Sequence, residues 1–320
     1  MAIQNQLMIS PSVGQMCEKD TKRNHERTSD KCVARENNST SHDMCGKGNT
    51  KIDDIISRLN PEEQETLARS SYRYLKCPVP SERDIFVRKA VRRCLEAKKG
   101  NVGKAFSSIQ KLIKFREDTK VSNMITSFDD SSNEYSNDTA RILKEHISTK
   151  KFYVQGFDKE GRSTLYFIPR NVVDHDLGSA IYSIERAIAC SRSSDETVNC
   201  VVDFSDFPLS NSPSLEIGKQ FLSTLRTIYV GHIHRIFLVN VPLSFSILWN
   251  VFSPFVGRET RDKITILKNN TGDKEKEILH FYDAEELPSW CVNVGKKNRS
   301  FDVDEYLLLL PFDVAFDSDQ

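Results

Sequence analysis

Beyond residue 139 the sequence alternates short apolar segments with segments of helical length, and this alternation restricts the fold more than any other feature. The segment Val198–Phe204 is almost continuously apolar, as expected for a strand buried on both faces. Strands are predicted at 152–155, 164–168, 198–204, 235–240 and 263–267, with helices at about 177–192, 214–229 and 243–253. Strands joined by helix-length crossovers form parallel or mixed sheets. The sequence therefore predicts an α/β domain with a mixed, largely parallel sheet flanked by helices.

The part of the chain before this domain differs from it in composition. Residues 1–50 contain no Phe, Tyr or Trp and are rich in Asn, Ser, Thr and charge, which predicts disorder. Apolar side chains recur at helical spacing from 51 to 121, and Asn60-Pro61 is a typical helix start. We expect a disordered segment at 1–50, a helical module at 51–128, a linker at 129–138, an α/β domain at 139–298 and an acidic tail at 299–320.

Charge and hydropathy exclude several classes of protein. The 45 basic and 45 acidic residues cancel, which argues against a surface devoted to nucleic acid. The charges are uneven, however, because residues 72–120 carry a net charge of +9 and residues 301–320 one of −6, so the two regions could attract each other. No apolar run reaches about 18 residues, and no secretory signal is recognisable. With eight dispersed cysteines, these features predict a cytoplasmic protein with reduced thiols.

Motifs for catalysis or metal binding are weak. Gly156–Ser163 has the glycine spacing of a phosphate loop, but it has Arg in place of Lys and precedes a strand instead of a helix. There is no Gly-x-Ser-x-Gly. His232 and His234 lack a nearby third ligand, and Asp203 and Asp206 fit a structural turn better than an acid/base pair. The sequence therefore predicts neither an enzyme nor a metal site nor a cofactor.

Residues 242–256 form the most unusual segment. As a helix, it would carry one stripe of Phe245, Leu248, Trp249 and Phe252, and further apolar residues would cover much of another side. A helix that is apolar nearly all round is either buried on all sides or in contact with something apolar that the chain itself does not supply. Two interpretations stay open: a core helix, or a wall between an apolar cavity and a membrane surface.

Several motifs in a fixed order make the chain similar to a known family. They are Cys94–Ala105 with Phe115-Arg116, Gly156-x-Asp158-x-x-Gly161-Arg162, Val201-Val202-Asp203, and Ile236–Pro242 followed by Phe245, Trp249, Phe252, Pro254-Phe255 and Thr260-x-x-Lys263-Ile264. Over about 84–290 the sequence resembles the CRAL-TRIO lipid-binding family, which includes the phosphatidylinositol transfer proteins. The segment around 84–116 resembles that family's N-terminal helical module.

The resemblance implies a lipid-sized cavity above a sheet, closed by a mobile gate helix. The gate residues would be Phe245, Leu248, Trp249, Phe252 and Phe255, and Lys263 would meet an anionic head group. Candidate cavity residues are Tyr166, Ile168, Val202, Phe221, Leu225, Phe237 and Val239. Gly231 stands where some members have an acidic residue that helps to hold inositol. The implied ligand is thus a phospholipid or another hydrophobic molecule, with phosphatidylinositol not specified.

The function implied by the resemblance is lipid binding and transfer by a monomer that contacts membranes transiently and binds no nucleic acid. Burying a chain of about 16 methylenes at ~0.8 kcal/mol each is worth about 13 kcal/mol, so the cavity must replace the bilayer almost completely. The alternative is an adaptor that uses the same fold for interaction with proteins or membrane surfaces and transfers no lipid.

Overall fold

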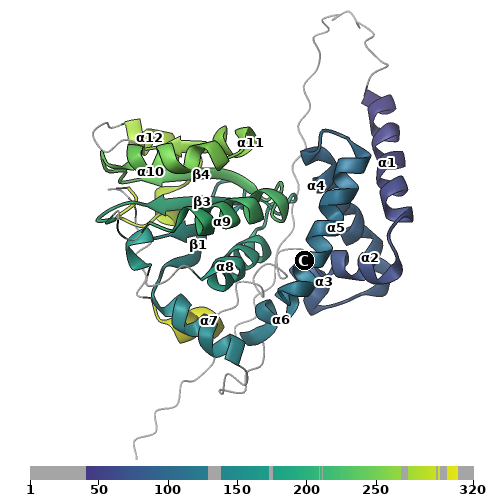
Figure 1. The fold of residues 1–320 in the computed structure, drawn as a ribbon, viewed down its shortest axis with the longest axis horizontal. Coiled ribbons are helices and arrows are strands. Elements are labelled where there is room, and N and C mark those ends of the chain that lie inside the picture. Colours follow the sequence, from purple (N-terminus) through teal and green to yellow (C-terminus); the bar gives the residue numbers. More distant parts are fainter. Residues whose placement is uncertain are drawn as a thin grey trace, which may run out of the picture.

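The structure is a computed structural model that describes residues 41–128, 138–172, 176–208, 210, 212–267, 273–292, 295 and 301–308. Figure 1 shows the α/β domain on one side and the N-terminal helices on the other. No helix in these ranges is long and apolar enough to cross a membrane. Within these ranges Cys77, Cys94, Cys190, Cys200 and Cys291 are free thiols, and Cys94, Cys190 and Cys291 are buried. The predicted disorder at 1–40 and the predicted linker, apart from Asp138, fall outside the described residues.

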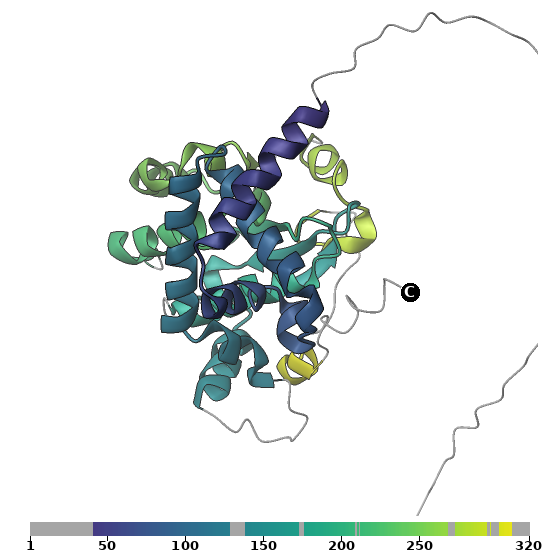
Figure 2. The same cartoon turned by 90° about the vertical axis from the view of Figure 1, so that its right-hand side faces the viewer.

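The N-terminal module consists of helices packed on one another. They are α1 (Ser41–Ser57), α2 (Pro61–Ala68), α3 (Tyr72–Lys76), α4 (Arg83–Ala97), α5 (Val102–Asp118) and α6 (Val121–Ile125). In Figure 2, which looks onto this module, α1 crosses the front and the strands lie behind. The start of α2 follows from its sequence, because Asn60 and Glu63 cap each other's backbone N–H groups. Helix α1 begins at Ser41, ten residues before the boundary at 51 expected from composition.

The second part is built on one five-stranded sheet. Its strands are β1 (Phe152–Phe157), β2 (Ser163–Phe167), β3 (Val198–Asp203), β4 (Ile233–Val239) and β5 (Ile264–Ile266), in the order β1-β2-β3-β4-β5. Strands β1 and β2 pair antiparallel, and all later neighbours pair parallel. Its helices are α7 (Asp138–Ser148), α8 (Leu177–Cys190), α9 (Leu215–Thr227), α10 (Phe245–Phe252), α11 (Arg258–Arg261) and α12 (Asp273–Leu279). The predicted α/β class and mixed sheet are confirmed.

The strand order explains how the helices are placed. Because each parallel strand is added on the same side of the last one, right-handed crossovers put the connecting helices α8, α9 and α10 on one face of the sheet. The opposite face is covered by α12 and the segment after it, whose Ile278 and Tyr282 are buried against Phe237. The sheet thus has one face under crossover helices and one face in a well-filled core.

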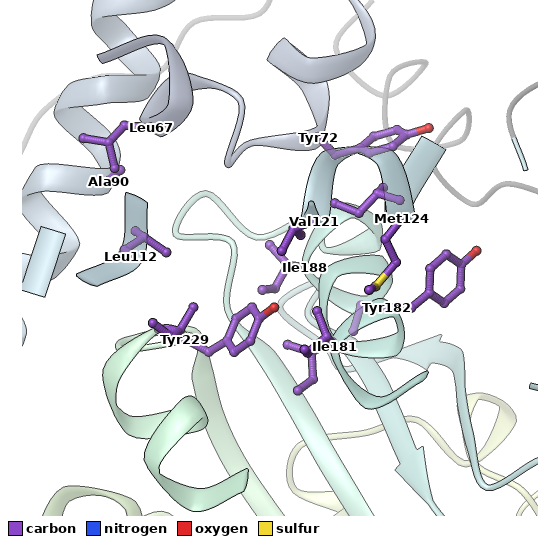
Figure 3. Packing of buried hydrophobic residues seen from close by; sticks show 14 of the residues in the cluster. Leu67, Tyr72, Ala90, Leu112, Val121, Met124, Ile181, Tyr182, Ile188 and Tyr229 are labelled. Atoms are coloured by element: carbon purple, nitrogen blue, oxygen red, sulfur yellow. The ribbon is translucent and has the colours of Figure 1, made fainter. Parts of the chain in front are cut away.

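A shared hydrophobic core joins the two parts of the chain. Figure 3 shows Leu112 of α5 in the same cluster as Ile188 of α8 and Tyr229. A buried ion pair crosses this junction, where Arg116 Nη1 lies 2.7 Å from Glu185 Oε1 and both side chains are about 95% buried, at 4% and 5% exposure. The hydroxyl of Tyr229 donates to the same carboxylate oxygen at 2.9 Å. The helical module and the sheet domain are therefore packed as one body.

The described part of the acidic tail contacts the sheet domain. It contains α13 (Val303–Leu308), where Asp304 pairs with Lys144 of α7 at 2.5 Å. The guanidinium carbon Cζ of the buried Arg186 lies over the ring of Tyr306, 3.9 Å from the ring centre. The Tyr306 hydroxyl accepts a hydrogen bond from Val154 N on the edge strand β1. This described segment is therefore held by an ion pair with α7 and by a cation–π contact with α8.

Candidate functional site

An apolar cavity of about 270 Å³ lies between the sheet and its crossover helices. Strands supply Phe152, Phe167, Val202, Leu238 and Ile264; α9 supplies Ile217, Gly218, Phe221 and Leu222; α10 supplies Phe245, Leu248, Trp249 and Phe252; and Lys151, Pro169, Val172, Asp176, Leu177, Ala180, Phe204, Phe207, Pro213 and Val256 complete the wall. The cavity thus occupies the space that the one-sided placement of the helices creates.

The cavity wall offers almost no polar partner. Two of the lining side chains carry a charge, and both already have partners within the protein. The ammonium of the buried Lys151 lies over the ring of Phe152, 5.5 Å from its centre. Asp176 caps α8 by accepting from Gly178 N and Ser179 N at 2.9 and 2.7 Å; burial opposes ionisation, but these N–H donors outweigh it and lower the pKa of Asp176. The interior is therefore suited to hydrocarbon.

Helix α10 forms one wall of the cavity. Phe245, Leu248, Trp249 and Phe252 line the cavity, and Phe245 packs edge-on against Phe204, 4.9 Å between ring centres. On its other side lies an exposed apolar stripe, formed by Leu243 (99% exposed), Ile247 (59%), Val251 (45%) and Phe255 (36%). Of the two interpretations left open by the sequence, the plain core helix does not fit this exposure. Phe255 belongs to the stripe and does not line the cavity.

The sequence-predicted cavity residues divide between the two faces of the sheet. Val202 and Phe221 line the cavity. Tyr166, Ile168, Phe237 and Val239 do not; they lie in the core on the opposite face. Leu225 points to the junction with the helical module. The reason is the two-residue period of a strand, since Val202 is in register with Phe167 and Leu238, whereas its neighbour Val201 is in register with Tyr166 and Phe237.

The same register identifies lining residues that the sequence reasoning missed, among them Phe167 and Leu238. Both could have been found from the sequence by assigning Val202 to the cavity face and then assigning to the same face the residues paired with it on the adjacent strands. The helix α8 residues Leu177 and Ala180 and the loop residues Phe204 and Phe207 carried no comparable signal.

The predicted head-group residue Lys263 is not presented to the cavity. Its ammonium donates to the backbone carbonyl of Ile233, and burial lowers the pKa of Lys263. Gly231, at the position of the family's acidic residue, has a φ of +80°, and a Cβ there would lie 2.6 Å from Cγ of Arg93. Arg93 is itself held by Glu196 at 2.8 Å and by Nε2 of His232 at 2.9 Å. The Arg93 side chain, which comes from α4, thus occupies the space next to Gly231.

Replacing Gly231 with glutamate is expected to destabilise the protein instead of creating a head-group site. The left-handed backbone costs a non-glycine residue about 1 kcal/mol, and the collision with Arg93 adds about 1–2 kcal/mol. Urea unfolding should show the combined loss of about 2–3 kcal/mol. Gly231→Ala, which adds the Cβ without the charge, should show most of the same loss. A stable Gly231→Glu protein would contradict this account of the close approach.

His232 is expected to make stability depend on pH. Burial, together with the charge of Arg93, lowers the pKa of His232 to about 3. The neutral ring fits its contacts, because Nδ1 can donate to Glu196 O at 3.1 Å while Nε2 accepts from Arg93. The unfolded chain takes up this proton near pH 6.5 and the folded chain does not, so stability falls as the pH drops below about 6.5.

The expected loss from His232 between pH 7.5 and pH 5.0 is about 2 kcal/mol. Other groups also titrate in this range, so the measurement is the difference between wild type and His232→Asn in urea unfolding at the two pH values. That difference should shift by about 2 kcal/mol in favour of the variant at the lower pH. Parallel pH profiles for the two proteins would rule out the assignment.

The mixed sheet, the crossover helices on one face and the cavity beneath them define an α/β domain built around a hollow apolar interior. Residues 147–291 match the CRAL/TRIO domain. Over these residues, just under half of the chain, the sequence is similar to the CRAL/TRIO domain family.

Similar proteins extend this likeness beyond the domain. A CRAL-TRIO domain-containing protein of Schizosaccharomyces pombe is 28% identical over 187 residues, covering 57% of this chain and 17% of that protein. From Arabidopsis thaliana, Patellin-6 is 24% identical (49% of this chain, 41% of the relative) and the phosphatidylinositol/phosphatidylcholine transfer protein SFH4 is 24% identical (65% and 36%). The chain thus spans less than half the length of these relatives. The crystal structure of Sfh5 superposes with a TM-score of 0.58 at 15% identity, covering 85% of this chain and 98% of Sfh5, which shows the shared fold.

Proposed function

We propose that this protein binds a phospholipid or a similar hydrophobic molecule in the cavity and exchanges it at membranes, without catalysis. One observation carries the proposal: a single helix, α10, lines an apolar cavity with one side and exposes an apolar stripe on the other. An apolar cavity whose covering helix also exposes apolar residues is costly in water and favourable against a bilayer. The name of the relative SFH4, a lipid transfer protein, supports the same function.

The stripe gives the proposal an orientation on the membrane. Leu243, Ile247 and Val251 would enter the bilayer, so that the opening of α10 exposes the cavity to lipid and not to water. Arg258 follows the stripe; its side chain is 94% exposed and lies 4.0 Å from a carboxylate oxygen of the exposed Asp262, a loose surface pair that it can exchange for anionic lipid at about 1 kcal/mol per well-placed charge. We place the protein in the cytoplasm as a monomer with transient membrane contact.

The ligand's polar part is not specified by the residues around the cavity. Lys263 is bonded to a backbone carbonyl, and the space beside Gly231 is taken by Arg93. These contacts favour a ligand held through its hydrocarbon portion, and they weigh against recognition of inositol at that position. Transfer of several phospholipid classes at similar rates is the corresponding expectation.

The direct test is to recover the ligand and then to measure its movement. Protein purified from cells that synthesise phospholipids should carry a hydrophobic molecule that native mass spectrometry detects and organic extraction releases. The purified protein should then move pyrene-labelled phosphatidylcholine between vesicles. A protein that carries no lipid and transfers none of the common phospholipid classes would leave the proposal without support and favour the adaptor alternative.

A further inference from the structure

Two residues from different helices meet in the wall of the cavity. Gly218 of α9 and Phe252 of α10 both line it. A Cβ built on Gly218 would lie 2.1 Å from Cε1 of Phe252 and 2.9 Å from both Cδ1 and Cζ. Carbon atoms in contact are separated by about 3.5–4.0 Å, so the ring rests directly on the backbone of α9 in a seat that no other residue can provide.

Among the described residues, helix geometry does not explain a glycine at this position. Gly218 lies within α9, after a helix start at which Ser214 accepts from Ile217 N, and its φ is not in the left-handed region. Glycine is among the poorest helix-forming residues, so helix geometry alone would favour alanine. This differs from Gly231, whose positive φ requires glycine. The contact with Phe252 is therefore what Gly218 provides.

The seat has a defined place in the attachment of α10. At its N-terminal end α10 is held by the buried Phe245. Towards its C-terminal end the contacts with α9 include Phe252 on Gly218 and, just beyond the helix, Lys219 Nζ over the ring of Phe255 at 4.4 Å from its centre. The outer side of α10 between these ends is exposed. Loss of the Phe252 contact would free the seam between α9 and α10 while Phe245 still anchored the helix.

We propose that Phe252, seated on Gly218, is the latch that holds α10 closed, and that the cavity opens along the seam between α9 and α10. Phe252 is a positioning residue here, because it sets the equilibrium between closed and open α10. The proposal rests on the proposed function in taking α10 as the gate, but the contact can be tested without any lipid.

The test adds one methyl group with Gly218→Ala. The new Cβ displaces the Phe252 ring, and the strain typical of an overpacked contact corresponds to a shift of roughly tenfold towards the open state. Hydrogen exchange of the α10 amides should therefore be about tenfold faster than in wild type. Uptake of cis-parinaric acid and transfer of pyrene-labelled phosphatidylcholine should be faster as well.

Matched variants separate the latch from a general loss of stability. Gly103→Ala makes the same change in α5, where the new Cβ would meet nothing nearer than the Asn101 side chain at 3.7 Å, so α10 exchange should stay at the wild-type rate. Phe252→Ala removes the latch without adding bulk and should also speed exchange in α10. In the Phe252→Ala background, adding Gly218→Ala should change nothing further, since the ring that collides is gone.

The results distinguish the latch from the proposed function. Unchanged α10 exchange in both Gly218→Ala and Phe252→Ala, or an equal effect of Gly218→Ala with and without the Phe252 ring, overturns the latch even if wild type transfers lipid. Faster α10 exchange that depends on Phe252 supports the latch. If neither cis-parinaric acid nor pyrene-labelled phosphatidylcholine then binds wild type or any variant, the latch is still supported, but the proposed function in lipid transfer is contradicted.

Discussion

Replacing Glu185 with alanine should lower the free energy of unfolding by about 3–5 kcal/mol, which is the usual cost of removing one partner of a buried ion pair. Arg116 would keep its charge at the junction between α5 and α8 without the carboxylate 2.7 Å away, and the hydroxyl of Tyr229 would lose its acceptor. Because these groups connect the helical module to the sheet domain, limited proteolysis should also separate the two parts more readily. Urea unfolding followed by circular dichroism gives the energy.

The matched control for Glu185→Ala removes both charges at once. Arg116→Met combined with Glu185→Leu keeps apolar volume at the junction and leaves no unpaired charge, so it should cost less than Glu185→Ala alone. A loss below about 1 kcal/mol for Glu185→Ala would mean that water reaches the junction and replaces the carboxylate.

Replacing Trp249 with aspartate should reduce lipid transfer by at least about tenfold while the fold is retained. Trp249 lines the cavity and stacks on Phe245, 6.0 Å between ring centres. A carboxylate there would face hydrocarbon in both the filled cavity and the bilayer, and neither environment solvates it. The measurement is transfer of pyrene-labelled phosphatidylcholine between vesicles, with circular dichroism to check the fold.

Asn250→Asp is the control for Trp249→Asp, because it introduces the same charge at the next position, which is exposed and already polar. Its transfer rate should stay within about twofold of wild type, since a solvated carboxylate carries no desolvation cost. Wild-type transfer by Trp249→Asp, or an equal loss in both variants, would remove Trp249 from the gate.

Much of the fold could be predicted because it depends on local patterns. The apolar segment at 198–204 predicted β3, and Asn60-Pro61 predicted the start of α2, since a buried strand and a helix cap each have a sequence signal a few residues long. The start of α1 at Ser41 could not be predicted, because the polar composition of residues 1–50, which include no aromatic residue, indicated disorder up to residue 50.

The candidate site was less predictable because it depends on pairing between distant segments. Val201 and Val202 are chemically identical, and only the register with β2 and β4 decides which of them faces the cavity. The role of Gly218 is set by Phe252 on another helix. Lys263 matched the family motif by its position in the sequence, but in the structure its ammonium donates to the carbonyl oxygen of Ile233 and does not face the cavity. Local patterns therefore located α10 and its aromatic stripe, whereas the cavity wall required three-dimensional structure.

The division of the sheet into a hollow face and a filled face has a consequence for how such a protein changes over time. On β3, Val202 borders empty space, while Val201 and Phe237 on the adjacent strand are fully enclosed by packed neighbours. Larger or smaller residues at positions like 202 can reshape the chamber at little cost to folding, whereas a change one residue away disturbs dense packing. Selectivity for cargo and conformational stability can thus evolve nearly independently, on alternate residues of the same strand.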